Sequence, residues 1–297
     1  MKENCKAATT KAKELGINPI YSFQNSDLVN PIIMTIMERK ANKEIIIGFS
    51  GTKNPLQLIE IGKNLNSKDY GIHKVDKSLV FAYFYDRYTT EFRNNLISKL
   101  DLISNSGNYK GYKIVFTGHS LGGALAVHAV SDAVHSKILQ NHDIHLYTFG
   151  QPRVGNFEFM NAFEHGVTEH YRIVHFKDMI PHLPPCLGNL NSGCQKIGFF
   201  DHICPYHGPT EIFYEDGMKS FKTCSSTEGE DSSCSNNQFN TSKANHLTYF
   251  GFEVGQLHEK DIQEHEAELL ESDQNSQEEE EILDIEDNVT ELKSLNS

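Results

Sequence analysis

The sequence contains no tryptophan, no CxxC pair, and no apolar run of the roughly 18 residues that a membrane-spanning helix needs. It also has no HExxH sequence and no calcium-binding loop, so we expect neither a metal ion nor an organic cofactor. No basic cluster or RNA-binding aromatic motif is present, which argues against nucleic acid as a partner. The first 16 residues are polar and do not resemble a signal peptide.

Positive charge is scarce only at the end of the chain. Residues 258–297 contain 15 acidic and 2 basic residues, whereas the first 257 residues contain 25 of each, so the net charge of −13 belongs to this terminal segment. Concentrated charge with few apolar residues is typical of disordered chains. We therefore expect one folded domain in residues 1–257 and a disordered acidic tail in residues 258–297, which could bind a partner of unknown kind.

Cysteine occurs six times, and five of these residues lie between positions 186 and 234 in a stretch rich in Gly, Pro, Ser and Asn. This distribution is typical of disulfides that hold the loops of secreted proteins. Glycosylation sequons at Asn240 and Asn288 agree with it. We therefore expect a secreted or a vacuolar/lysosomal protein, with a truncated start that would explain the missing signal peptide. A cytoplasmic location is the alternative.

Apolar runs alternate with segments of helical periodicity along the folded part. This alternation predicts an α/β fold with a mainly parallel central sheet and helices on both faces. We expect strands at residues 31–39, 44–49, 113–117, 145–149, 171–176 and 211–214. We expect helices at residues 75–102, 121–139 and 245–257.

The strongest motif is Gly-His-Ser-Leu-Gly, in which Ser120 stands between two glycines. A buried strand precedes it, and a helix rich in Ala, Gly and Leu follows. A nucleophilic serine at a sharp strand-to-helix turn needs small neighbours two positions away on each side. The N-terminus of the following helix points its N–H groups at developing negative charge. Ser120 is therefore the predicted nucleophile of an α/β-hydrolase.

Two longer segments extend this motif into a family resemblance. GHSLGGALA at residues 118–126 and TFGQPRVGN at residues 148–156 resemble the fungal-type triacylglycerol lipases, also called class 3 lipases. The resemblance runs from about residue 31 to residue 251. It implies an α/β-hydrolase fold and hydrolysis of lipid esters.

The acid and the base should follow Ser120 in the order acid, then histidine. Asp178 comes directly after a predicted strand and stands where the resembling lipases carry their catalytic aspartate, in a D-x-[IV]-P-H-x-P-P context. His246 begins a late His-x-x-Tyr segment of the family, although Asn245 replaces the aspartate that usually precedes it. We expect Asp178 and His246 to complete the triad. His207 is the competing base, and Asp201 is the competing acid.

An oxyanion hole needs two donors aimed at the carbonyl oxygen. One is expected to be the backbone N–H of Leu121. The other is Thr52, in a segment that resembles the F-R-G-[ST] motif of the family, with Ser50 in place of its arginine. By analogy with the same lipases, the apolar segment after Thr52 is expected to form a lid. Its apolar residues are Leu56, Leu58, Ile59 and Ile61.

Disulfide pairing stays open at this stage, because six cysteines allow 15 fully paired patterns. A bond between Cys224 and Cys234 would hold the long loop that leads to His246. The remaining candidate pairs are Cys194 with Cys204, and Cys5 with Cys186.

Together these residues predict a serine esterase or lipase that hydrolyses carboxylic ester bonds of acylglycerols through an acyl-enzyme on Ser120. Its partner would be a lipid ester substrate at a lipid–water interface. A phospholipase A1 and a soluble carboxylesterase are alternatives within the same class. A non-catalytic lipid-binding or interaction protein on the same scaffold is the alternative outside it, and the intact triad argues against it.

Overall fold

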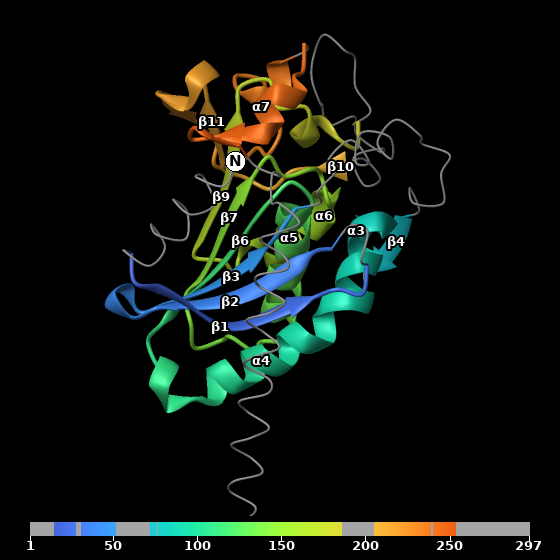
Figure 1. Ribbon diagram of the computed structural model, residues 1–297. Helices are drawn as coiled ribbons and strands as arrows, with labels where there is room; N and C mark the ends of the chain where they lie inside the picture. Colours follow the sequence, from blue (N-terminus) through green and yellow to red (C-terminus); the bar gives the residue numbers. More distant parts are fainter. Residues whose placement is uncertain are drawn as a thin grey trace, which may run out of the picture. The chain divides into compact units, whose positions relative to one another are not determined.

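The computed structural model describes residues 15–27, 31–51, 72–75, 77–185, 205–238 and 240–253. Its main feature is an eight-stranded sheet in the order β1-β2-β3-β6-β7-β9-β11-β12 (Figure 1). The strands are β1 (Ile17–Gln24), β2 (Ile33–Arg39), β3 (Glu44–Phe49), β6 (Lys113–His119), β7 (Ile144–Phe149), β9 (Glu169–His175), β11 (Glu211–Tyr214) and β12 (Phe221–Thr223).

The centre of the sheet is parallel, as predicted. β3, β6, β7, β9 and β11 are parallel neighbours, whereas β1, β2 and β12 add antiparallel strands at the edges. The six predicted strands correspond to β2, β3, β6, β7, β9 and β11. The edge strands β1 and β12 were not predicted, because their partly exposed residues lack the apolar runs of buried strands. The expected α/β architecture with a mainly parallel central sheet is therefore confirmed.

Helix α5 (Leu121–His135) is the central helix of the fold and packs against β3, β6 and β7. Its sequence is rich in Ala, Val, Leu and Gly, and twelve of its fifteen residues are buried, as expected of a helix in the core. Leu125, Ala126 and Val130 have no exposed surface. The helix ends four residues before the predicted boundary at residue 139, and Lys137 there adopts a left-handed φ of 57°.

The predicted helix at residues 75–102 is wrong in its first part. Val75 is the last residue of β4 (Ile72–Val75), the next strand is β5 (Ser78–Phe81), and the helical part begins only at Ala82. β5 pairs with a short strand, β8 (Gly155–Asn156), in a second sheet of order β10-β8-β5-β4 that also includes β10 (Pro205–Tyr206). Short apolar runs fit a strand and a helix equally well, and here the distant pairing partner decides.

The helical part of this segment contains an irregular turn. α3 (Ala82–Arg87) passes through a π-helical turn, η3 (Tyr88–Phe92), into α4 (Arg93–Asn105). After α5, the described residues form the helix α6 (Phe157–Glu164). Short 3₁₀ turns lie at Lys40–Asn42, Gly107–Tyr109, Ile180–His182, Asp216–Met218 and Ser235–Asn237.

The predicted helix at residues 245–257 is also largely wrong. α7 (Lys243–Leu247) is a single short turn, and a hairpin of β13 (Thr248–Tyr249) and β14 (Phe252–Glu253) follows it. The two residues that join these strands, Phe250 and Gly251, both have positive φ, at 52° and 80°. Two consecutive left-handed residues end a helix and close a tight hairpin.

Two predictions about the chain ends concern residues outside the described ranges. These are the acidic tail at residues 258–297 and the candidate disulfide of Cys5. Within the described ranges, no helix is both long and apolar enough to cross a membrane.

Candidate active site

Ser120 occupies the sharp turn between β6 and α5, where its backbone has φ 57° and ψ −124°. The glycines around it are required by close backbone packing. A side chain at Gly118 would collide with the backbone of Gly122, and one at Gly122 would collide with the carbonyl oxygen of Phe49 in β3. The turn thus forces Ser120 into a strained conformation at the carboxyl end of the central strand, where open α/β sheets bind their ligands.

The structure brings Ser120, His246 and Asp178 together, although 126 residues separate the first two. The Nε2 atom of His246 lies 2.9 Å from Ser120 Oγ, and its Nδ1 atom lies 2.9 Å from each carboxylate oxygen of Asp178. All three residues are at most 2% exposed. An ionised carboxylate can only accept, so Nδ1 of His246 carries the proton and Nε2 is free to accept the proton of Ser120.

Asp178 is held by hydrogen bonds from three directions. Besides His246, it accepts a bond from the backbone N–H of Ile180 (2.9 Å) and one from the hydroxyl of Tyr249 (2.6 Å). Burial opposes its ionisation, but the neighbouring His246 and these hydrogen bonds outweigh burial and lower the pKa of Asp178 below its ordinary value. The carboxylate is therefore kept charged where the imidazole needs a negative partner.

Two further histidines hold the segment that carries His246. His119, next to the nucleophile, donates from Nε2 to the backbone carbonyl of His246 (2.9 Å), and the two rings stack at 4.5 Å. Burial, and then the positive charge that His246 can carry, lowers the pKa of His119 to about 3, so it stays neutral. His175, at the end of β9, donates from Nδ1 to the carbonyls of Thr248 (2.7 Å) and Asn245 (3.0 Å).

Tyr249 and His175 have roles that were not predicted from the sequence. Tyr249 was visible as the tyrosine of the His-x-x-Tyr segment, but only the fold shows that its hydroxyl reaches Asp178. His175 lies in a strand that was correctly predicted, and no local signal in the sequence distinguishes it from the other histidines of the chain.

Of the two predicted oxyanion donors, the structure describes one. Leu121 is the first residue of α5 and is 1% exposed. The N–H groups in the first turn of a helix have no partner within that helix, so the N–H of Leu121 is left without a partner inside α5. Gly51 lies against His119 and Ser120, which brings the end of β3 to the same place.

The second predicted donor and the predicted lid cannot be placed. These residues are Thr52, Leu56, Leu58, Ile59 and Ile61, and they lie outside the described residues. The same is true of Asp201, the competing acid.

His207, the competing base, has a different role. Its Nε2 donates to the carbonyl of Pro181 (2.8 Å), and its backbone N–H donates to Glu230 (3.0 Å). Burial, and then the nearby arginine charges, lowers the pKa of His207 well below its ordinary value. His207 is thus a neutral structural residue of the fold, and His246 is the histidine that contacts Ser120.

Arg153 and Asn156 of the TFGQPRVGN segment form contacts that stabilise the fold. Arg153, which is 2% exposed, forms a two-point ion pair with Glu230 (2.8 and 2.9 Å) and donates to the carbonyl of Pro184. Asn156 caps α6 by accepting from the N–H of Phe159, and the same oxygen accepts from the N–H of Leu79 in β5. Arg153 thus fixes the loop between β12 and α7, which leads to His246.

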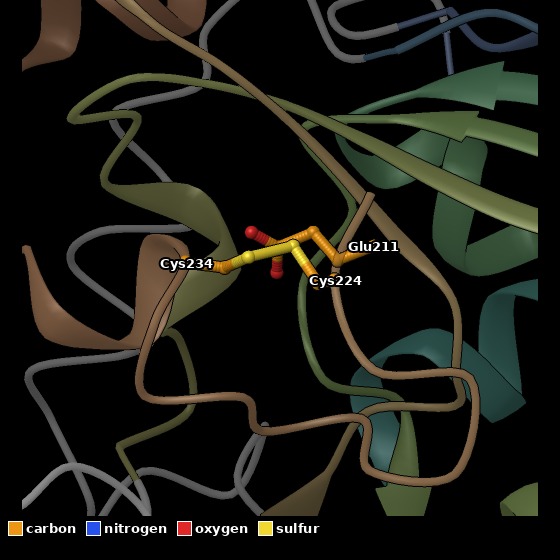
Figure 2. A group of neighbouring side chains, drawn as sticks. All are labelled: Glu211, Cys224 and Cys234. Atoms are coloured by element: carbon orange, nitrogen blue, oxygen red, sulfur yellow. A yellow bond between two sulfur atoms is a disulfide. The ribbon is translucent and has the colours of Figure 1, made fainter. Parts of the chain in front are cut away.

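A disulfide fastens the same loop. The bond between Cys224 and Cys234 is buried beside the carboxylate of Glu211 (Figure 2). These three residues have ligand atoms within 4.8 Å of one another, but the sulfurs are bonded to each other and Glu211 accepts hydrogen bonds from Ser235. The cluster therefore offers no thiolate to a metal ion. The first candidate disulfide is present, and the other two lie outside the described residues.

Comparison with known proteins identifies relatives over most of the chain. The family model described as lipase (class 3) matches residues 46–188. Lipase ZK262.3 of Caenorhabditis elegans is 33% identical over 245 residues, which cover 76% of this chain and 67% of the relative. A lipase of Rhizomucor miehei is 33% identical over 183 residues, which cover 61% of this chain and 46% of the relative.

Solved structures agree with the sequence relatives. A triacylglycerol lipase whose catalytic centre is described as a serine protease triad superposes with a TM-score of 0.65 at 27% identity, over 82% of this chain and 84% of that chain. The chain therefore belongs to the class 3 lipases, a family of serine hydrolases with the α/β-hydrolase fold.

Proposed function

We propose that this chain is an esterase or lipase that hydrolyses the carboxylic ester bonds of acylglycerols, with Ser120 as nucleophile, His246 as general base and acid, and Asp178 as the residue that orients and stabilises the imidazole. The observation that carries the proposal is the continuous buried chain of hydrogen bonds from Ser120 Oγ through both nitrogens of His246 to Asp178. The relatives named as triacylglycerol lipases support acylglycerols as the substrate class.

The first half of the reaction forms the acyl-enzyme. Ser120 Oγ attacks the ester carbonyl carbon while its proton moves to Nε2 of His246. The carbonyl π electrons move to the oxygen, which becomes an anion. The tetrahedral intermediate then collapses, the bond between carbon and the alcohol oxygen breaks, and the protonated His246 gives its proton to that oxygen. The neutral alcohol leaves, and the acyl group stays on Ser120.

The second half repeats these steps with water. His246 takes a proton from water as the water oxygen attacks the acyl carbon, and the bond between that carbon and Ser120 Oγ breaks. The proton returns to Ser120 from His246, and the carboxylic acid leaves. Asp178 remains ionised throughout and stabilises each imidazolium, in accord with the lowered pKa of its carboxyl group.

The oxyanion of both intermediates is assigned to two backbone donors, Leu121 and Thr52. The position of Leu121 at the N-terminus of α5 supports the first, because helix N-terminal N–H groups and the helix dipole both favour negative charge there. The assignment of Thr52 as the second donor rests on the sequence motif after β3. The lid at residues 56–64 rests on the same resemblance.

The proposal also includes the location of the enzyme and the division of its chain into a folded domain and a tail. We infer that the lipid ester substrate is bound at a lipid–water interface. The buried disulfide between Cys224 and Cys234 supports a secreted or vacuolar location, since such bonds persist in oxidising compartments. We assign the folded domain to residues 1–257 and a separate acidic tail to residues 258–297, on the charge distribution of the sequence.

The test is hydrolysis of p-nitrophenyl esters from acetate to palmitate by the wild type and by Ser120→Ala. We expect the substitution to reduce kcat by a factor of about 10⁶. Ser131→Ala is the matched control, because Ser131 is a buried serine within α5 that contacts His135 rather than the triad. A folded wild type without activity, or a Ser120→Ala variant that keeps it, would overturn the proposal.

A further inference from the structure

A cavity of about 1100 Å³ lies apart from the triad, along the second half of α5. Sites for small molecules typically measure roughly 300–1,000 Å³, so this cavity is large enough to hold one. Its walls come from α3, η3, α4, α5 and α6, and α5 contacts both α3 and α6 (Figure 1). His128, the residue of α5 in its wall that is nearest to Ser120 in sequence, comes eight residues later. That separation is about 12 Å along the helix axis, so the cavity is distinct from the candidate active site.

Aromatic rings enclose the imidazole of His128 in the wall of this cavity. The side chain is buried, and the whole residue is 3% exposed. The ring of Tyr88 is nearly parallel to it, at 5.9 Å between centroids. The rings of Tyr85 and Phe159 contact it at 5.6 and 5.4 Å. Burial among these rings lowers the pKa of His128 to about 3, so the imidazole is neutral at physiological pH.

The Nε2 atom of His128 is buried and has no hydrogen-bond partner among the described residues. Leaving a buried ring nitrogen unpaired is unfavourable, and such atoms are uncommon in folded proteins. A neutral imidazole carries its proton on one nitrogen, so Nε2 is a donor in one tautomer and an acceptor in the other. A hydroxyl group can both donate and accept, and it therefore fits either tautomer.

The charges around the cavity cancel, and most of them are paired within the protein. Among the described lining residues, the lysine, arginine and acidic side chains are Lys77, Arg93, Asp132 and Glu158. Arg93 forms a two-point ion pair with Asp132, at 2.8 and 3.1 Å. Glu158 accepts a hydrogen bond from the side chain of Asn156 (2.6 Å). This balance of charge favours an uncharged ligand.

The π-helical turn η3 fixes the wall of the cavity opposite α5. Tyr88 and Arg93 are five positions apart, which would place them roughly 140° apart around a regular α-helix. In this turn both reach the carboxylate of Asp132, to which the hydroxyl of Tyr88 donates (3.0 Å). π-helical turns are rare and occur frequently at functional sites. The wall is therefore held by specific contacts, and the cavity is not a gap left by loose packing.

We propose that this cavity binds an uncharged molecule built on a hydroxylated aromatic ring. The ring of the ligand packs against Tyr85 and Phe159, since aromatic rings favour offset and edge-to-face contacts, and its hydroxyl pairs with Nε2 of His128. That nitrogen is covered in the structure, so Tyr85, the half-buried ring of the wall, moves aside as the ligand enters.

An acyl chain fits this cavity less well. The described lining residues include two aliphatic side chains, Val75 and Ala162, and the other apolar groups are aromatic rings. An acyl chain also has no group that could pair with Nε2 of His128. The proposed ligand is therefore different in kind from the lipid ester that we assign to the triad.

The test compares 4-ethylphenol with ethylbenzene, which has nearly the same shape but no hydroxyl. Neither compound is an ester, so both are titrated into the wild-type protein and the result does not depend on hydrolysis. We expect 4-ethylphenol to bind with a Kd on the order of 1 mM, as is usual for a fragment of this size. Ethylbenzene should bind at least about tenfold more weakly, because it leaves Nε2 unpaired. NMR should show shifts at the methyl groups of Val75 and Ala162, and none at those of Leu121 beside the triad.

The sharpest variant is His128→Phe, which keeps a ring of similar size and removes the nitrogen. It should weaken binding of 4-ethylphenol roughly tenfold and leave binding of ethylbenzene unchanged. His170→Phe is the matched control. His170 is another buried histidine whose Nε2 has no partner among the described residues, but it does not line the cavity. A purely structural role of His128 would change the stability of the protein without changing its preference between the two compounds.

Ala162→Trp tests the location of the site. Ala162 is exposed on α6 and lines the cavity, so a large side chain there should fill the space without disturbing the core. We expect this variant to lose binding of both compounds.

Several results would overturn the inference. These include equal affinities of the wild type for the two compounds, or no binding of either. A preference for 4-ethylphenol that persists in folded His128→Phe, or that is lost equally in folded His170→Phe, would contradict the role of the imidazole. Undiminished binding to Ala162→Trp, or NMR shifts at Leu121 instead of Val75 and Ala162, would place the compounds elsewhere. Ester hydrolysis, which tests the proposed function, enters none of these measurements.

Discussion

Replacing Tyr249 with phenylalanine tests how the buried carboxylate of Asp178 is stabilised. The Tyr249 hydroxyl donates to Asp178 Oδ2 (2.6 Å) and accepts from the backbone N–H of His175 (3.2 Å). A hydrogen bond to a charged group contributes about 1.5–3 kcal/mol, and a buried N–H without its partner costs about 1–3 kcal/mol. We expect the substitution to lower the free energy of unfolding at pH 7 by about 3 kcal/mol.

The pH dependence separates these two contributions. The folded-state pKa of Asp178 is depressed, so its ionisation contributes stability above the ordinary aspartate value of 3.8, and that stability is lost as the pH falls through the folded-state value. Loss of the tyrosine bond raises the pKa of Asp178 in the variant. The difference in the free energy of unfolding between wild type and Tyr249→Phe should therefore shrink as the pH falls below about 4. The part of this difference that comes from the unpaired N–H of His175 should remain.

The assay is urea unfolding of both proteins between pH 3 and pH 8, together with the pH profile of kcat/KM. We expect kcat/KM to fall roughly tenfold at neutral pH, much less than the factor of about 10⁴ that follows loss of the triad carboxylate itself. Tyr112→Phe is the matched control, because it removes a hydroxyl that donates to the surface carboxylate of Glu38 (3.1 Å). A loss of stability at pH 7 that persists unchanged at pH 3 would refute the reasoning.

Three further substitutions probe the surroundings of the site. Gly122→Ala places a methyl group against the carbonyl of Phe49 and should destabilise the fold by about 3 kcal/mol, whereas Gly107→Ala, which meets open space, should be neutral in thermal unfolding. Arg153→Met leaves Glu230 buried without its partner and should cost about 3–5 kcal/mol in urea unfolding, of which added Glu230→Gln should restore a part. Burial lowers the pKa of His128 to about 3, so the unfolded chain gains a proton below pH 6.5 that the folded protein does not. Relative to wild type, His128→Phe should therefore gain about 2 kcal/mol of stability between pH 7 and pH 5, and equal pH slopes for the two proteins would contradict this.

The parallel core of the fold was predictable because burial on both faces leaves apolar runs that are visible locally. The edge strand β1 and the strand β5 were not, because their assignment depends on partners far along the chain. Val80 of β5 pairs with Gly155, and nothing near Val80 in the sequence records that contact. The hairpin after His246 was mistaken for a helix because aromatic residues such as Tyr249 and Phe252 fit either pattern.

The candidate triad was predictable for a different reason. A nucleophile in a strained turn restricts its neighbours, and the restriction appears in the sequence as Gly118 and Gly122. Asp178 follows a recognisable strand, and His246 follows the family motif. The residues that hold the triad in place carry no such local restriction, because the contacts of Tyr249 and His175 exist only once the sheet and the C-terminal hairpin have met.

The support of His246 differs in kind from that of Ser120. Ser120 is fixed by close backbone packing between β6, α5 and β3 in the core of the fold. His246 comes at the end of a long connection with little regular structure. That connection is fastened by the Arg153–Glu230 ion pair, by the buried disulfide, and by carbonyl contacts from His119 and His175. The serine should therefore keep its geometry under conditions that displace the histidine, and reduction or acidification should abolish activity before the sheet itself unfolds.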